Sequence, residues 1–140
     1  MKILLAVDGS NHTRRMLDYI AAHKELLGAG NRYTAFTVVP SVPSGAARFI
    51  DKAVIEEHYR EEAERVLAPV RQFATTHGWD VGTVHAHGRA SDAIAAYAQE
   101  QKADLIVMGT HGHSLLSNMA LGSVANGVLS RCTVPVLLVR

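Results

Sequence analysis

The chain has 140 residues, of which 48% are hydrophobic and 19% are charged. This length and composition allow one hydrophobic core, so we expect a single domain over residues 1–140. Fourteen basic residues nearly balance thirteen acidic ones, which argues against a nucleic-acid-binding surface. No apolar run could cross a bilayer, and Cys132 is the only cysteine. We therefore expect a cytoplasmic protein with no membrane or nucleic-acid partner.

The first half of the chain predicts two strands and two helices. Residues 3–7 form a continuous apolar run that ends in turn residues, which is typical of a buried strand. Residues 13–27 carry apolar side chains at helical spacing, and residues 33–39 form a second β-rich run. Residues 47–77 are charged and amphipathic, which predicts a long helix. We expect a kink or break just before Pro69, because proline lacks the N–H that continues the hydrogen bonding.

The second half continues the alternation of strands and helices. The remaining predicted elements are strands at 79–86, 104–108 and 134–139 and helices at 92–101 and 124–131. Ser91 is expected to be the N-cap of the first of these helices. Strands that alternate with helices predict a parallel sheet with right-handed crossovers. Ligands of such sheets lie at the carboxyl ends of the central strands, where the strand order reverses.

The strongest functional signal is a glycine-spaced loop after the fourth predicted strand. The loop reads glycine, two residues, glycine, nine residues, glycine and serine, at Gly109, Gly112, Gly122 and Ser123. Glycines let the backbone approach an anion, and the following helix offers unpaired N–H groups at its N-terminus. The alternative is a flexible connection, but the strand before the loop and the helix after it favour phosphate binding. The loop lacks the lysine with which P-loop enzymes contact the terminal phosphates.

With this signature, the chain resembles the universal stress protein family over its whole length. Four further segments carry the resemblance, at residues 3–10, 36–39, 103–112 and 132–140. The resemblance implies a doubly wound α/β fold with a five-stranded parallel sheet of order 3-2-1-4-5 and helices on both faces. It also implies binding of ATP or a related adenine nucleotide, and dimers. Some members lack the signature and do not bind ATP, whereas this chain has every position and resembles the ATP-binding subgroup.

The resemblance also implies roles for individual residues. Asp8 would contact the ribose or a phosphate-bound magnesium ion, and the main chain at Val38 would pair with the adenine edge. His113 stands where family members often have arginine, so a group that changes charge with pH would lie near the phosphates. Two simpler interpretations remain open. Asp8 would also serve as a turn former before the first helix, and Val38 would be a core residue in any case.

The eight histidines suggest a metal site. His85 and His87 share one face of a predicted strand, while His111 and His113 flank Gly112. In the order 3-2-1-4-5 the two pairs lie three strands apart, roughly 14 Å at about 4.8 Å per strand. The sequence also lacks a Cys-x-x-Cys or His-Glu-x-x-His pattern. We therefore expect no structural zinc, and only magnesium at Asp8 together with a nucleotide.

These observations predict an ATP-binding stress-adaptation protein that acts as a binder or switch with little turnover. The alternative is a slow magnesium-dependent ATPase or nucleotidyl transferase, and a third interpretation is a nucleotide-free scaffold. Because no lysine or arginine stands at the signature positions, we favour the binder and assign no catalytic residue. The last strand is an edge strand in the family order, so Val136–Val139 would pair with its own copy in a homodimer.

Overall fold

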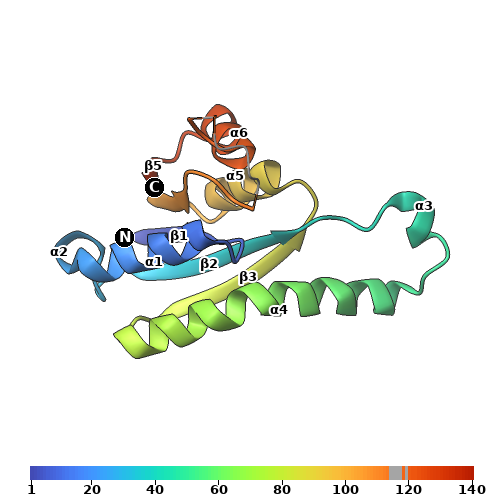
Figure 1. Ribbon diagram of the computed structural model, residues 1–140, viewed down its shortest axis with the longest axis horizontal. Coiled ribbons are helices and arrows are strands. Elements are labelled where there is room, and N and C mark those ends of the chain that lie inside the picture. The colour runs from blue at the N-terminus through green and yellow to red at the C-terminus, as the bar shows by residue number, and fades with distance from the viewer. Residues whose placement is uncertain (114–117, 119) are drawn as a thin grey trace.

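A computed structural model describes residues 1–113, 118 and 120–140 of the chain. Its centre is a five-stranded parallel sheet of order β3-β2-β1-β4-β5 (Figure 1). The strands are β1 Lys2–Ala6, β2 Arg32–Val39, β3 Val81–His87, β4 Leu105–Gly109 and β5 Val136–Val139. The predicted fold class and strand order are therefore confirmed.

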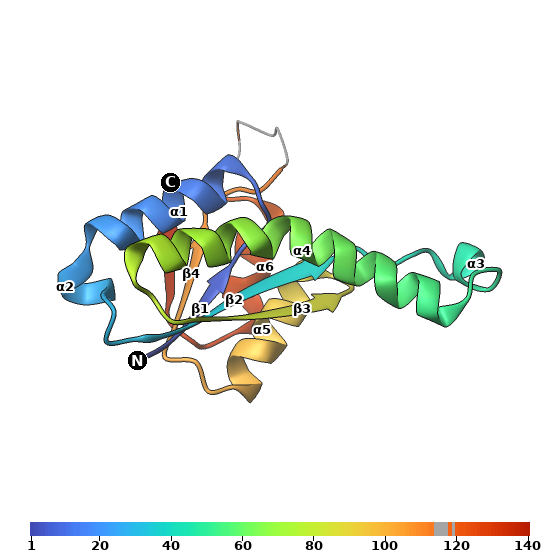
Figure 2. The same ribbon diagram turned by 90° about the horizontal axis from the view of Figure 1, so that it is seen from below.

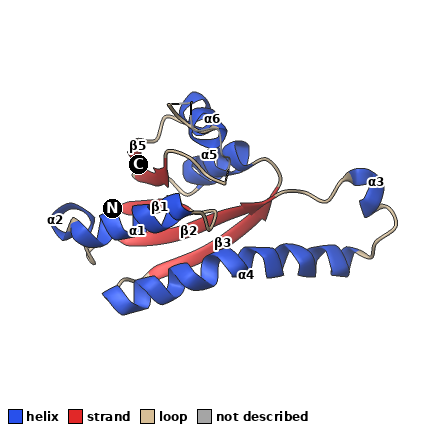
Figure 3. Cartoon of the chain, in the orientation of Figure 1, coloured by secondary structure: helices blue, strands red, loops and turns tan. Residues whose placement is uncertain are grey.

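Helices cover both faces of the sheet (Figure 3). They are α1 Asn11–Ala22, α2 Lys24–Leu27, α3 Ser44–Ala47, α4 Lys52–His77, α5 Ala90–Glu100 and α6 Ser123–Arg131. Side chains of α1 and α4 join the core on one face, and those of α5 and α6 join the core on the other. No helix in the described residues combines the length and the hydrophobicity needed to span a membrane.

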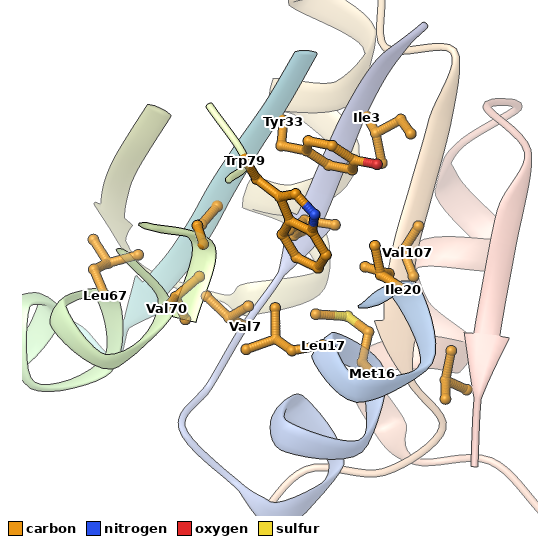
Figure 4. Packing of buried hydrophobic residues seen from close by; sticks show 14 of the residues in the cluster. Ile3, Val7, Met16, Leu17, Ile20, Tyr33, Leu67, Val70, Trp79 and Val107 are labelled. Atoms are coloured by element: carbon orange, nitrogen blue, oxygen red, sulfur yellow. The ribbon is translucent and has the colours of Figure 1, made fainter. Parts of the chain in front are cut away.

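The larger core lies between the sheet and helices α1 and α4. Figure 4 shows Met16 and Ile20 of α1 and Val70 of α4 pointing into the same cluster as strand residues. Successive residues of β1 alternate between the two cores, and Leu5 is completely buried. Because side chains of a strand alternate between its faces, only a strand that is apolar throughout can be covered on both sides. β1 meets this condition and occupies the centre of the sheet.

Three local predictions from the sequence are wrong. The helix expected over 13–27 is interrupted at His23, which separates α1 from α2. The helix expected over 47–77 begins only at Lys52, and the short α3 ends at Ala47 before it. α4 continues through Pro69 without a break, because Pro69 is exposed and water can hydrogen-bond the main-chain carbonyl left without a donor.

Ser91 is not the N-cap of the helix that contains it. α5 begins at Ala90, its N-cap is Arg89, and Ser91 is 7% exposed within the helix. A Cβ atom placed on Gly127 of α6 would lie 2.4 Å from the Ser91 Cβ atom. Small residues at both positions therefore allow α5 and α6 to pack closely beside the site described below.

The first turns of α4 and all of α3 reach beyond the sheet (Figure 2). Their base is fixed at Tyr59, whose hydroxyl accepts the main-chain N–H of Val42 at 2.8 Å. The Tyr59 ring stacks on the His87 ring with centroids 4.3 Å apart. Phe49, near the tip, is 89% exposed. The charged helix pattern thus forms an arm whose outer part contributes little to the core.

The uninterrupted course of α4 predicts that Pro69→Ala stabilises the protein. Alanine restores a main-chain N–H and a strong helix former at an exposed position, so we expect a gain of about 1–2 kcal/mol in the free energy of unfolding. Urea denaturation followed by circular dichroism measures it. Pro40→Ala is the control, because Pro40 lies outside the helices and its loss should destabilise by less than about 1 kcal/mol. A destabilising Pro69→Ala would contradict this account of α4.

Candidate functional site

The main pocket lies at the carboxyl edge of the sheet and has a volume of ≈ 220 Å³. The ends of β1, β2 and β4 and the N-termini of α5 and α6 line it. β2 and β3 lie on one side of β1, and β4 and β5 lie on the other. The strand order therefore reverses between β1 and β4, next to the pocket. All the residues that the sequence singles out for binding line this pocket, namely Asp8, Val38, Gly109, Gly112, His113, Gly122 and Ser123.

Asp8 follows β1 and uses one carboxylate oxygen to hold the first turn of α1. Its Oδ1 atom accepts the Ser10 N–H and the Thr13 hydroxyl, each at 2.9 Å. The Thr13 hydroxyl in turn accepts the Asp8 N–H at 3.0 Å. Within the described part of the chain no donor contacts Oδ2, the oxygen that lies toward Gly112. Asp8 is therefore a turn former that uses one carboxylate oxygen for the turn, while the other lies toward Gly112.

The glycines of the signature make room for protein atoms. A Cβ atom on Gly109 would lie 2.6 Å from the Cβ atom of His12, and one on Gly112 would lie 2.5 Å from Oδ2 of Asp8. A Cβ atom on Gly122 would lie 3.1 Å from the carbonyl oxygen of Thr110. The sequence suggested that these glycines admit an anion to the backbone. The structure supplies another reason, namely that the loop packs tightly against the end of β1 and the start of α1.

The N-terminus of α6 points unpaired main-chain N–H groups at the pocket. Gly122 is the N-cap and provides no side-chain cap, while its own N–H donates to Thr110 at 2.7 Å. The first intrahelical bond runs from the Asn126 N–H to the Gly122 carbonyl. The N–H groups of residues 123–125 therefore have no acceptor in the helix, and the helix dipole adds partial positive charge there. Ser123 occupies the first helical position and does not cap the helix.

The other half of the pocket is apolar. Phe36, Ile94 and Met108 lie on its wall, and the Phe36 ring stacks on Tyr97 with centroids 4.6 Å apart. The Phe36 carbonyl accepts the N–H of Val7 at 3.0 Å, so this residue faces β1. Alternate residues of a strand face the same neighbour, so the N–H and carbonyl of Val38 also face that side. β1 ends at Ala6, which leaves this polar edge directed at the pocket.

Two histidines complete the rim of the site. Nε2 of His113 lies 2.6 Å from the main-chain carbonyl oxygen of Asp8, so this nitrogen carries the proton and donates. Nδ1 of His111 lies 3.0 Å from the Thr110 hydroxyl. Among the described residues that line the pocket there is no lysine or arginine. The described residues also contain no group of three or more His, Cys, Asp or Glu side chains that could hold a metal ion.

Several pocket residues were not identified from the sequence. Thr13 could have been suspected, because a hydroxyl one helical turn after an Asp-Gly-Ser turn often bonds back to the carboxylate. Phe36, Ile94 and Met108 carry no such signal. They have the character of ordinary core residues. Phe36 and Met108 reach the pocket because they are register partners of Ala6, the last residue of β1.

The comparisons with known proteins agree with this fold. The family model of the universal stress protein family matches residues 1–140, the full chain. The chain belongs to this family. Universal stress protein YxiE of Bacillus subtilis is 31% identical over 150 residues, which cover 99% of this chain and 98% of YxiE.

Solved structures of universal stress proteins share the architecture. The structure of MJ0577 from Methanocaldococcus jannaschii superposes with a TM-score of 0.81 at 26% identity, covering 99% of this chain and 94% of that one. The universal stress protein of Archaeoglobus fulgidus, solved in complex with dAMP, has a TM-score of 0.65 at 25% identity. That match covers 100% of this chain and 98% of the other.

The close contact at Gly109 predicts that Gly109→Ala destabilises this universal stress protein. The added methyl group would overlap the His12 side chain, so we expect a loss of about 1–3 kcal/mol in the free energy of unfolding. Gly45→Ala is the matched control, because the same atom at Gly45 meets nothing within 4 Å. Chemical denaturation compares the two variants. Equal stability of both would show that the loop does not need the missing side chain.

Proposed function

We propose that this protein binds adenine nucleotides, including ATP together with magnesium. We further propose that it is cytoplasmic and acts as a binder or switch in stress adaptation. The observation that carries the proposal is the division of one pocket into two parts. An apolar wall with a polar strand edge stands at one end, and the uncapped N-terminus of α6 stands at the other. The dAMP complex of the Archaeoglobus fulgidus relative supports this choice of ligand.

The two parts of the pocket suggest how the nucleotide lies. The phosphates would accept hydrogen bonds from the N–H groups of residues 123–125, and the dipole of α6 would favour their charge. Because Nε2 of His113 donates to the Asp8 carbonyl, His113 would add a donor through Nδ1 in its protonated form. The base would lie against Phe36 and Ile94, and the free edge of Val38 would supply one main-chain donor and one acceptor to it.

Asp8 would lie between the base and the phosphates. Its Oδ2 atom is a hard oxygen ligand of the kind that magnesium takes alongside phosphate oxygens. We propose binding with little turnover, because phosphoryl transfer relies on cationic groups that stabilise the charge of the transition state. The described pocket lining offers helix N–H groups and histidines in place of lysine or arginine.

A single charge at Ser123 tests the proposed position of the phosphates. Ser123→Asp places a carboxylate at the first position of α6, where it favours the helix but repels phosphate. Ser123→Asn has nearly the same size without the charge. We expect Ser123→Asp to bind AMP and ATP at least about tenfold more weakly than Ser123→Asn, since like charges about 4 Å apart near a protein surface repel by about 4 kcal/mol. Calorimetry at fixed ionic strength measures the affinities.

Adenosine serves as the ligand control, because it lacks phosphate and should bind both variants equally. Equal AMP affinity in the two variants would place the phosphates away from α6. Failure of the unaltered protein to bind AMP, ATP or adenosine at millimolar concentration would refute the proposed function.

We also propose a homodimer that forms through β5. β5 is an edge strand of the sheet, and its residues Val136, Leu137 and Leu138 are only half-buried. The carbonyls of Pro135 and Val139 accept N–H groups from the β4 side. By alternation, Val136 and Leu138 direct their N–H and carbonyl groups outward, as a template for a second copy.

This alternation identifies the position at which proline should disrupt the dimer. Leu138→Pro removes an outward N–H from each copy, whereas Leu138→Ala shortens the side chain and keeps that N–H. Two lost hydrogen bonds at about 1 kcal/mol each should weaken the proline variant's dimer at least about tenfold relative to the alanine variant's. Sedimentation equilibrium measures the dimer dissociation constants of both variants. A monomeric unaltered chain at micromolar concentration would refute the dimer.

A further inference from the structure

A second cavity lies at the opposite, amino edge of the sheet and has a volume of ≈ 110 Å³. It lies between the first residues of β1 and β2 and the carboxyl-terminal end of α5. None of its lining residues belongs to the nucleotide pocket. Its volume is half that of the pocket at the carboxyl edge, so it suits a smaller ligand.

Two cations stand side by side at this cavity. Lys2 and Arg32 are register partners in the parallel pair of β1 and β2, and both line the cavity. Like charges directly opposite on neighbouring strands destabilise a sheet. No carboxylate forms an ion pair with either side chain within the described part of the structure. Asp104 is close to Lys2, but its carboxylate accepts the main-chain N–H of Lys2 at 2.7 Å.

The side chains of Lys2 and Arg32 have few hydrogen-bond partners among the described residues. Nζ of Lys2 lies 3.4 Å from the carbonyl oxygen of Gln101, at the limit of a hydrogen bond, and Arg32 has no side-chain partner among the described residues. The carbonyls of Tyr97 and Ala98 in the last turn of α5 already accept N–H groups of the residues that follow, at 2.9 Å. The helix end is therefore closed by its own backbone.

Two neutral hydroxyls also line the cavity. Those of Thr34 and Tyr97 have no hydrogen-bond partner among the described residues. Thr34 follows Arg32 on the same face of β2, and the Tyr97 ring is held by its stacking on Phe36. The cavity is thus lined by a lysine, an arginine and two residues that carry hydroxyl groups.

We propose that this cavity binds a small oxyanion with two negative charges, such as phosphate or a short dicarboxylate. A dianion between Lys2 and Arg32 would turn their repulsion into two attractions, and the planar guanidinium can donate two parallel hydrogen bonds to such a group. The hydroxyls of Thr34 and Tyr97 would donate to the remaining oxygens. The site is independent of the proposed nucleotide site.

Backbone amide spectra of ¹⁵N-labelled protein test the proposal with inorganic phosphate as the probe. Sodium chloride keeps the ionic strength constant throughout the titration. We expect saturable shifts at the amides of residues 2–4, 32–34 and 97–103. Lys2→Gln and Arg32→Gln should each weaken this binding by about fivefold or more, as expected for loss of one partly exposed charge contact.

Lys102→Gln is the matched control, because Lys102 lies at the same edge without lining the cavity and should leave the phosphate affinity unchanged. Succinate titrated in parallel separates the two ligand types. Saturation by both identifies a general dianion site, and saturation by phosphate or succinate alone identifies that ligand class.

Two results would overturn the proposal. The first is that the amide shifts do not saturate, or that sodium chloride alone reproduces them. The second is that phosphate binds the unaltered protein, Lys2→Gln and Arg32→Gln with equal affinity. AMP titrated into the same samples reports on the carboxyl-edge pocket through the amides of residues 110–113 and 123–125. Loss of those shifts would count against the nucleotide site alone.

Discussion

The burial of β1 on both faces is the constraint from which the rest of the structure follows. Leu4 and Leu5 point into opposite cores, so β1 must lie between two layers of helices and between two other strands. β2 and β4 flank β1 on its two sides, so the connections that follow β1 and β4 lead toward opposite edges of the sheet. The pocket occupies the space that opens there, and Asp8 stands at its floor because it is the first polar residue after the buried run.

The end of β1 also shapes the loop that follows β4. Gly112 lies against the Asp8 carboxylate and Gly109 against His12 at the start of α1, so the loop packs on the end of β1. The Gly122 N–H then closes the loop onto Thr110, which sets where α6 begins. The contacts that complete the fold therefore also aim the unpaired N–H groups of α6. Stability and the proposed anion binding would share these residues, so a side chain added at Gly109 or Gly112 would disturb both.

The two edges of the sheet offer positive charge in different ways. At the carboxyl edge the charge is partial and comes from main-chain N–H groups, whose positions the helix fixes. At the amino edge α5 presents its carboxyl-terminal end, so positive charge there must come from side chains such as Lys2 and Arg32. A parallel α/β sheet has this polarity throughout, because its helices all run back against the strands.

The sequence by itself determined the alternation of strands and helices, the central place of β1 and the glycine signature, because these depend on local apolar patterns and on residue types. The resemblance carried by that signature extended the prediction to the strand order. Only the tertiary structure decided which groups face one another. Pro69 continues a helix because it faces solvent, Ser91 packs on Gly127, and Val38 turns its polar edge to the pocket because β1 stops short beside it. Lys2 meets Arg32 through strand register. Such contacts join residues far apart in the chain, and local patterns carry no information about register or about where a neighbouring strand ends.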